Sequence, residues 1–307
     1  MSLSRVAAID CGTNSIRLLV ADLDPDTGEL HELDRRMTIV RLGQGVDRTG
    51  RLAPEALERT FAACREYASV IAAHGATRLR FVATSASRDA ENRDEFTAGV
   101  RAILGVEPEV VSGDEEAELS FTGATRELLG STELRPPYLV FDLGGGSTEF
   151  VLGTDRVEAA RSVDIGCVRM TERHGEDTLA MRADIKRALD LAAETVPLTG
   201  AATLVGLAGT VTTVAAIALE LPTYDWAAIH HSRIPLERVR EVTQMLLAAS
   251  HEERAAIPVM HPGRVDVIGA GALVLLAVME RTGAAELVVS EHDILDGIAW
   301  SVVVSRA

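Results

Sequence analysis

The chain has 307 residues, of which 47% are hydrophobic and 25% are charged, a composition typical of a globular protein with one large or two ordinary domains. Thirty basic residues against 46 acidic ones give a formal net charge of −16. This charge argues against general binding to nucleic acid or to anionic membranes, because both require a basic surface. Because the protein as a whole is acidic, an anionic substrate must be bound by hydrogen-bond donors or basic side chains at its own site.

The cysteines and the apolar runs indicate the compartment. Cys11, Cys64 and Cys167 are odd in number and far apart, which predicts free thiols in a reducing environment and no disulfide framework. The longest apolar run, Val267 to Met279, is shorter than the about 20 residues that a bilayer span needs, and it predicts a buried helix. The N-terminus has no signal-peptide pattern. We therefore expect a cytoplasmic protein that binds neither nucleic acid nor membranes.

The first predicted elements are two strands, at residues 6–9 and 16–20, which are joined by Asp10-Cys11-Gly12-Thr13-Asn14-Ser15. Residues 138–152 repeat this layout around Asp142-Leu143-Gly144-Gly145-Gly146-Ser147. In both segments an Asp ends the first strand, and a second strand follows the glycine-containing loop without an intervening helix. Each segment predicts a β-hairpin with a special turn, and the repeat predicts a duplicated α/β architecture.

The elements that follow each hairpin recur in the same order. A third strand, a helix and a buried strand are predicted near residues 31–42, 54–74 and 79–83, and again near residues 157–165, 180–196 and 203–207. Residues 133–137 end in paired prolines and form the best linker, so we place the domain boundary between about residues 113 and 137. The apolar spacing of residues 293–306 predicts a final helix that could pack on either domain.

The two glycine loops are candidate phosphate sites. A loop of Gly and Ser between two strands lets backbone N–H groups converge, and such a set of donors binds anions. Neither loop has the spacing of a P-loop or a Rossmann motif. Either loop alone could be an ordinary hairpin turn, but the matched pair favours two loops that grip a phosphoryl chain.

Several acidic residues lie where catalysis or metal binding needs them. Asp10 and Asp142 end their strands, a usual place for a carboxylate that orients hydrated magnesium, with an Asx-turn as the alternative. Glu149 lies in an otherwise apolar strand, where an unpaired buried carboxylate would be costly, so it should face a cleft or a metal. Ser112 and Glu115 form a predicted capping box, which leaves Glu116 as the candidate general base.

Two further segments place polar groups after buried strands. The hydroxyl groups of residues 84–87 are predicted to cap a helix at whose N-terminus Arg88 could reach an anion, and a structural role is about as well supported. Gly209 and Thr210 follow a strand at the end where α/β folds receive ligands. His230 and His231 have no further ligands at metal-site spacing, and we interpret them as ordinary residues.

These motifs together resemble the exopolyphosphatase and guanosine pentaphosphate phosphohydrolase (Ppx/GppA) family, within the acetate-kinase, sugar-kinase, Hsp70 and actin (ASKHA) superfamily. The resemblance spans nearly the whole chain and includes Val40-Arg41-Leu42-Gly43 and Arg264-Val265-Asp266-Val267-Ile268. It implies an α/β fold of two actin-like, ribonuclease H-like domains that face each other across a cleft. The first would span residues 1–125 and the second residues 126–307, with a C-terminal helix at about 291–307 that could pack on the first.

The resemblance also implies an activity and the residues that perform it. The expected reaction is the release of terminal orthophosphate from inorganic polyphosphate with Mg²⁺, and with K⁺ as an optional second cation. By motif position, Glu116 corresponds to the catalytic carboxylate, Asp142 and Glu149 to acids that organise metal and water, and Asp10 to a further metal ligand. The groups implied to bind phosphate are Gly12, Thr13, Asn14, Ser15, Arg88, Gly144, Gly145, Gly146, Ser147, Thr148, Gly209, Thr210 and Arg264.

Two alternatives stay open, and two features depart from the family pattern. Hydrolysis of guanosine pentaphosphate (pppGpp) uses the same chemistry, and a nucleotide-binding sensor without hydrolysis would use the same two domains to bind its ligand.

Longer relatives continue into a helical domain that is absent here, which favours short polyphosphate chains as substrates. Leu295-Asp296-Gly297 stands where the family usually has Arg-Glu-Gly, so no role of that arginine can be transferred. A homodimer is expected from the family alone.

Overall fold

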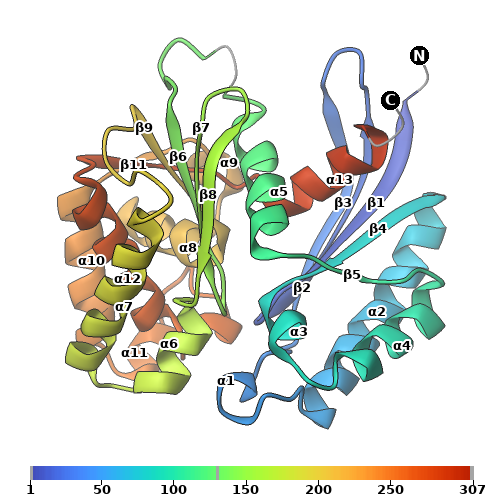
Figure 1. Cartoon of the computed structure of the whole chain (residues 1–307), viewed down its shortest axis with the longest axis horizontal. Coiled ribbons are helices and arrows are strands. Elements are labelled where there is room, and N and C mark those ends of the chain that lie inside the picture. The colour runs from blue at the N-terminus through green and yellow to red at the C-terminus, as the bar shows by residue number, and fades with distance from the viewer. Residues whose placement is uncertain (1–2, 129–130, 305–307) are drawn as a thin grey trace. The chain divides into compact units, whose positions relative to one another are not determined.

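The computed structural model describes residues 3–128 and 131–304, which divide into two compact units (Figure 1). The first unit contains the chain up to Gly123 together with the segment from Ile294 onward, and the second unit runs from Ala124 to Asp293. Among the described residues, no helix combines the length and hydropathy needed to cross a membrane.

The first unit is built on a five-stranded mixed sheet in the order β3-β2-β1-β4-β5. Its strands are β1 (Ser4–Cys11), β2 (Ser15–Leu23), β3 (Leu30–Ile39), β4 (Arg78–Ala83) and β5 (Glu109–Val110). Its helices are α1 (Val46–Thr49), α2 (Pro54–His74), α3 (Ser85–Asp89), α4 (Arg93–Leu104), the greater part of α5 (Gly113–Thr125) and α13 (Ile294–Val304).

Alternating side chains of β1 supply two hydrophobic cores, one on each face of this sheet. Ala7 and Ile9 pack in a core with α2 and α4, whereas Val6 and Ala8 pack in a core with α13 (Figure 1). The helix α2 begins with Pro54 at its first position and ends at Gly75 in the left-handed conformation, as helix start and stop signals require. The final helix predicted from the apolar spacing is therefore α13.

The helix α13 lies directly against α5 within the first unit. A Cβ atom at Gly297 would come within 2.0 Å of the backbone oxygen of Leu119, so only glycine allows this approach. The neighbouring Asp296 is buried, and its Oδ1 accepts a hydrogen bond of 2.6 Å from Nη2 of Arg35. Asp296 and Gly297, which belong to the segment that departs from the family pattern, thus help to hold α13 in place in the first unit.

The second unit repeats the first with an added edge strand. Its six-stranded sheet has the order β10-β11-β9-β6-β7-β8, so β8-β7-β6-β9-β11 corresponds to β3-β2-β1-β4-β5. The strands are β6 (Tyr138–Leu143), β7 (Thr148–Gly153), β8 (Val157–Val163), β9 (Thr203–Leu207), β10 (Arg233–Pro235) and β11 (Glu286–Val289). The expected α/β fold of two domains with mixed sheets is confirmed.

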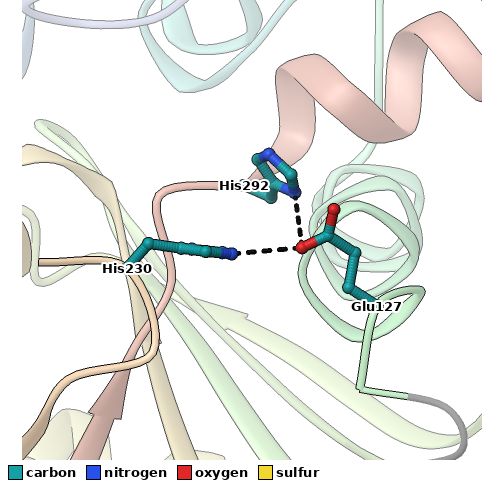
Figure 2. A group of neighbouring side chains, drawn as sticks. All are labelled: Glu127, His230 and His292. Carbon is teal, nitrogen blue, oxygen red and sulfur yellow. Dashed lines mark hydrogen bonds and ion pairs between the residues drawn. The ribbon is translucent and has the colours of Figure 1, made fainter. Parts of the chain in front are cut away.

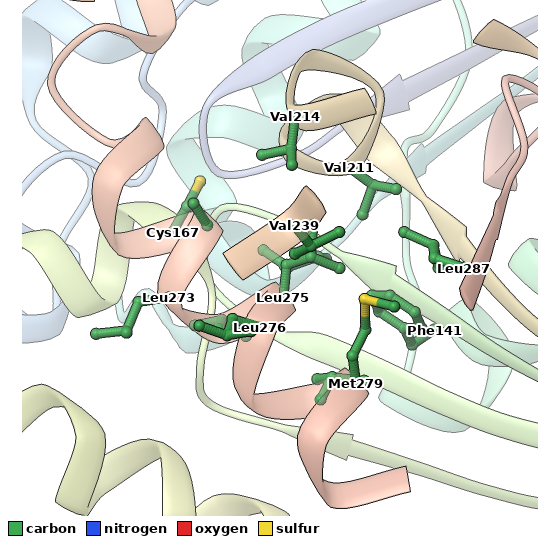
Figure 3. Close-up of a cluster of buried hydrophobic side chains, with 14 of the residues drawn as sticks. Phe141, Cys167, Val211, Val214, Val239, Leu273, Leu275, Leu276, Met279 and Leu287 are labelled. Atoms are coloured by element: carbon green, nitrogen blue, oxygen red, sulfur yellow. The ribbon is translucent and has the colours of Figure 1, made fainter. Parts of the chain in front are cut away.

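One core of the second unit forms around the helix α12 (Ile268–Thr282), which is apolar on all sides up to Met279 (Figure 3). The helices of this unit are α6 (Cys167–His174), α7 (Thr178–Ala193), α8 (Ala208–Ala218), α9 (Trp226–Ile229), α10 (Leu236–Ala248), α11 (His251–Ala255), the 3-10 helix η1 (Pro262–Arg264) and α12 (Ile268–Thr282). The buried helix predicted from the longest apolar run is α12.

Two predicted helix caps differ from the structure. The amide of Glu115 donates to Ser112 Oγ at 3.2 Å, but the Glu115 carboxylate pairs with Arg80 instead of completing the capping box. Thr84 precedes α3 and makes no side-chain cap. In the first case a nearby guanidinium competes more strongly for the carboxylate than a backbone N–H does.

Candidate active site

In each unit the candidate residues follow the carboxyl ends of adjacent parallel strands. In the first unit Cys11 of β1 lies beside Ala83 of β4, and Ala83 lies beside Val110 of β5. The first glycine loop, the 84–88 segment and the start of α5 therefore share one edge of the sheet. In the second unit Asp142 of β6 lies beside Leu207 of β9, so the second glycine loop and the start of α8 also share an edge. Ligands of α/β proteins bind at this edge.

The first glycine loop has its carbonyl groups occupied by a neighbouring segment. Gly12 donates to the oxygen of Ser15 at 2.9 Å, which closes the turn. The carbonyl oxygens of Thr13 and Asn14 accept hydrogen bonds of 2.8–3.0 Å from amides of residues 40–43. The amides of Thr13 and Asn14 have no acceptor within the described part of the chain, and Asn14 Oδ1 is buried there without a partner.

The second glycine loop has the same arrangement. Gly144 donates to the oxygen of Ser147 at 3.1 Å, and the carbonyl oxygens of residues 144–146 accept hydrogen bonds of 2.9–3.2 Å from amides of residues 166–169. The amides of Gly145, Gly146 and Ser147 find no acceptor in the regions that the structure describes. Ser147 Oγ is buried and likewise has no partner there.

Both loops therefore present N–H donors, because their acceptors are already bonded on the other side. A group of backbone amides that lack an internal acceptor binds an anion, and phosphate oxygens are suitable acceptors. Residues 166–169, whose amides bind the carbonyls of the second loop, approach it closely. A Cβ at Gly166 would lie 2.2 Å from the backbone of Gly145. This close approach explains why the sequence has glycine at position 166.

The acidic residues of the two hairpins have different partners at equivalent positions. Asp142 and Glu149 are paired across β6 and β7, and Glu149 is paired with Ser162 of β8. Ser162 Oγ donates to Glu149 Oε1 at 2.7 Å, and both carboxylates are buried. Residues paired in this way point to the same face of the sheet, so two carboxylates lie side by side.

In the first hairpin the equivalent cross-strand pair of residues forms an ion pair. Asp10 is paired with Arg17 across β1 and β2, and the Arg17 guanidinium donates to Asp10 Oδ2 at 2.7 and 3.0 Å. Asp10 thus has a permanent cation beside it, whereas Asp142 has a second carboxylate. A bound cation would therefore offset the charges of Asp142 and Glu149.

Glu116 lies in the first turn of α5 and contacts Arg88. The Arg88 guanidinium donates to Glu116 Oε2 at 3.1 Å and to the backbone oxygen of Val111 at 2.9 Å. The Glu116 side chain is 10% exposed and that of Arg88 is 27% exposed. The structure thus brings together two residues that are 28 positions apart in the sequence, and it keeps the carboxylate next to a positive charge.

Gly209 and Thr210 lie in the first turn of α8, and Gly209 is next to Arg264 of the 3-10 helix. The Arg264 guanidinium occupies the space of a Cβ at Gly209, which would lie 1.6–1.8 Å from its atoms. Ala208 precedes them with a positive φ of 69°, which turns the chain from β9 into the helix. Thr210 is buried against Gly271 of α12. Arg264 therefore adds positive charge at a helix N-terminus, a place that favours anions.

Some predicted phosphate ligands have structural partners. The Thr148 hydroxyl is buried and donates to the oxygen of Ile165 at 2.9 Å, and Thr13 Oγ1 shares a hydrogen bond of 2.8 Å with Ser85 Oγ. Thr148 begins β7, directly after the second loop, and Thr13 contributes its backbone to the first loop. Within the first unit the structure brings together the first loop, Arg88 and Glu116; within the second it brings together the second loop, Asp142, Glu149, Gly209, Thr210 and Arg264.

One cluster of side chains joins His230 to two residues that were not singled out from the sequence, Glu127 and His292. Glu127 Oε2 lies 3.1 Å from His230 Nε2 and 3.3 Å from His292 Nδ1 (Figure 2). The sequence favours an ordinary role for His230 because no ligand stands near it along the chain. The three residues meet only through the fold, so no local spacing could have revealed them.

Several known proteins are similar to this chain over nearly its whole length. A family model described as the Ppx/GppA phosphatase family matches residues 19–305. A Mycobacterium tuberculosis protein named exopolyphosphatase 2 is 53% identical, over 98% of this chain and 99% of its own. A crystal structure of an exopolyphosphatase-like protein has a TM-score of 0.92 at 45% identity, over 97% of both chains. The crystal structure of the Aquifex aeolicus Ppx/GppA family member has a TM-score of 0.81 at 28% identity, over 99% of both chains.

Proposed function

The chain belongs to the Ppx/GppA phosphatase family, and we propose that it is an exopolyphosphatase that releases terminal orthophosphate from inorganic polyphosphate. The names of the Mycobacterium tuberculosis relative and of the solved exopolyphosphatase-like protein support this activity. The observation that carries the proposal is the pair of glycine loops whose carbonyls are bonded and whose amides are left for an external acceptor. A chain of phosphates offers such acceptors at regular intervals.

The residues present fit a magnesium ion. Mg²⁺ binds carboxylate oxygens, and Asp142 and Glu149 place two buried carboxylates side by side. An ion there would offset their charges and polarise a phosphoryl oxygen of the substrate. We assign the ion to Asp142 and Glu149, because Asp10 already has Arg17 as its cation. K⁺ is retained as an optional second cation.

The remaining roles follow from the contacts of each side chain. Glu116 accepts the proton of the attacking water while the water oxygen bonds to the terminal phosphorus and the bridging P–O bond breaks. Arg88 orients the Glu116 carboxylate through their hydrogen bond. The loop amides, Arg88 and Arg264 offset the negative charge of the phosphoryl oxygens, which an acidic protein would otherwise repel. Short chains are the preferred substrates under this proposal.

The test compares three substrates at equal concentrations of terminal phosphate. Orthophosphate release is measured from short polyphosphate, long polyphosphate and pppGpp, each with and without Mg²⁺, and K⁺ is then replaced by Na⁺. Faster turnover of short polyphosphate supports the proposal. Turnover of pppGpp alone would assign the same residues to a pppGpp phosphohydrolase. Tight nucleotide binding without phosphate release from any substrate would identify a sensor.

A further inference from the structure

Arg169 of α6 binds the second glycine loop through both its backbone and its side chain. Its amide donates to the carbonyl oxygen of Gly145 at 3.0 Å, and its guanidinium Nε donates to that of Gly146 at 2.7 Å. The residue belongs to none of the motifs that the sequence singles out, and no step of the proposed reaction uses its side chain. Its contacts with the loop nevertheless concern the groups that are left for an external anion.

The carbonyl group of Gly146 differs from the other carbonyl groups of the loop in the donors that it receives. Those of residues 144 and 145 accept only backbone amides of residues 167–169, at 2.9–3.0 Å, within the part of the chain that the structure describes. That of Gly146 accepts the amide of Gly166 at 3.2 Å and the Arg169 guanidinium at the shorter distance. A hydrogen bond from an ionised donor is roughly twice as strong as a neutral one. The guanidinium is therefore the main anchor of this carbonyl group.

The Arg169 side chain is held in place behind the loop. It is only 11% exposed, and its Nη2 lies 3.8 Å from Oδ1 of Asp164, a residue whose side chain is 71% exposed. The guanidinium group is planar and donates in fixed directions, so a bond through Nε restricts its orientation. Arg169 is thus a rigid support and not a mobile surface charge.

Anchoring the carbonyl groups fixes the direction of the loop amides. A peptide unit is planar and trans, so its C=O and N–H groups point in opposite directions. The carbonyl of Gly145 shares a peptide unit with the amide of Gly146, and the carbonyl of Gly146 shares one with the amide of Ser147. Neither amide has an acceptor among the described residues. By binding two successive carbonyls, Arg169 turns two successive N–H donors away from α6.

The positive charge of Arg169 also strengthens the donor at Ser147. Hydrogen bonds in series polarise one another, so a peptide group whose carbonyl accepts from a guanidinium is a better donor at its N–H. Ser147 is 1% exposed, and its Oγ is buried without a partner in the regions that the structure describes. The amide and the hydroxyl of this residue are therefore both left for a bound anion.

We propose that Arg169 is a positioning residue of the phosphate site, which orients and polarises the amides of Gly146 and Ser147 through the carbonyl groups behind them. The inference rests on the proposed function, because it assigns the second loop to a phosphate of the substrate. Loop amides bind phosphate oxygens before the reaction as well as during it, and such uniform binding lowers KM without raising kcat. The loss of Arg169 should therefore weaken substrate binding more than it slows bond cleavage.

Three variants of the full chain test this role. Arg169→Met removes the guanidinium but keeps the backbone amide, and Arg169→Lys keeps the charge but loses the Nε donor. The matched control is Arg182→Met, which removes one charge from an exposed residue of α7. The kcat and KM are measured with inorganic tripolyphosphate and Mg²⁺. Calorimetry gives the Kd of imidodiphosphate, whose P–N–P bridge resists hydrolysis, and the melting temperature reports on folding.

The expected result is a change in binding with little change in turnover. In Arg169→Met, KM and the Kd of imidodiphosphate should rise about five- to twentyfold, as for the loss of a hydrogen bond at the site. The kcat should change by less than about twofold. Arg169→Lys should recover part of the affinity, and Arg182→Met should behave like the wild type.

Other results would overturn the proposal. Unchanged KM and Kd in Arg169→Met would do so, even with a lower melting temperature, because Arg169 would then be a structural support alone. A fall in kcat at constant KM would also contradict it. A wild type that binds imidodiphosphate but releases no phosphate fails the proposed function, while the Kd of Arg169→Met still decides the role of Arg169. A wild type that neither binds nor hydrolyses these compounds would overturn both.

Discussion

Glu149 lies directly opposite Asp142 in the β6–β7 hairpin, and the two carboxylates are buried on the same face of the sheet. The equivalent pair of the β1–β2 hairpin is Asp10 and Arg17, which form an ion pair of 2.7 Å. In one hairpin of the duplicated fold the cross-strand pair is an acid and a base, and in the other it is two acids. Two carboxylates directly across a strand pair are unfavourable by themselves, and this is the reason why we propose a cation site at Asp142 and Glu149.

Glu149→Gln should separate stability from cation binding. Removing one of two adjacent charges should leave stability unchanged or raise it by up to about 1 kcal/mol, because the repulsion is relieved. We expect Mg²⁺ to raise the melting temperature of the wild type by mass action and to have no such effect on the variant. The matched control, Asp10→Asn, leaves Arg17 without its partner and should lower stability in the presence or absence of Mg²⁺. An equal Mg²⁺-induced increase in Glu149→Gln would show that the ion binds elsewhere.

Gly166→Ala should damage the second glycine loop. The new Cβ would lie 2.2–2.3 Å from backbone atoms of Gly145 and Gly146, so the loop or α6 must move. We expect a loss of about 1–3 kcal/mol in unfolding free energy, together with a rise in KM for polyphosphate. Gly269→Ala in α12 is the control, since its Cβ would meet nothing closer than 3.6 Å and alanine favours the helix by up to about 1 kcal/mol. Urea unfolding of both variants measures the difference.

Asp184 should contribute to the loss of stability in acid. Burial acts to raise its pKa, but hydrogen bonds from Arg173, His174 and Arg187 prevail and lower it to about 2. Because the folded pKa lies below the unfolded value, the contribution is complete above about pH 4 and is lost as the pH falls toward 2. With solvent screening it amounts to about 1–2 kcal/mol.

Urea unfolding at pH 6 and pH 3 checks this contribution. Asp184→Asn should lower stability at pH 6 and have a smaller effect at pH 3. Glu194→Gln, at an exposed residue that follows α7, should show neither effect. A constant difference between wild type and Asp184→Asn at both pH values would argue against an ionic role of Asp184.

The thiols should be inert in the folded protein. Cys11, Cys64 and Cys167 are buried, and burial raises the pKa of each thiol, that of Cys64 to about 12. The thiolate is the reactive form, so a disulfide reagent at pH 8 should label none of the three residues. All three should react after addition of denaturant. Rapid labelling of any of them in the native state would contradict the burial described.

The sequence predicted the elements that depend on local signals. The helix at residues 54–74 is found with those bounds, because Pro54 and Gly75 mark its ends. The two hairpins and their glycine loops are also found, since their strands are apolar and their turns glycine-rich. The capping box at Ser112 was half wrong, because Arg80 of the strand β4 binds the Glu115 carboxylate.

What the sequence could not provide depends on contacts between distant segments. The loops were candidate anion sites from composition, but their carbonyls are occupied by residues 40–43 and 166–169 only in the folded chain. The different partners of Asp10 and Asp142 follow from strand register, which places residue 17 or 149 opposite. The cluster of Glu127, His230 and His292 brings together three separate segments, so neither periodicity nor motif spacing points to it.

The most direct test of the account is orthophosphate release from short polyphosphate in the presence of Mg²⁺ by the wild type, Glu116→Gln and Glu115→Gln. Glu115 is adjacent to Glu116 but pairs with Arg80, so its variant controls for the loss of a charge from α5. We predict that Glu116→Gln folds normally and loses activity by a factor of about 10² to 10⁴, the range for removal of a general base, while Glu115→Gln remains active. Full activity in Glu116→Gln, or no phosphate release by the wild type, would contradict the account.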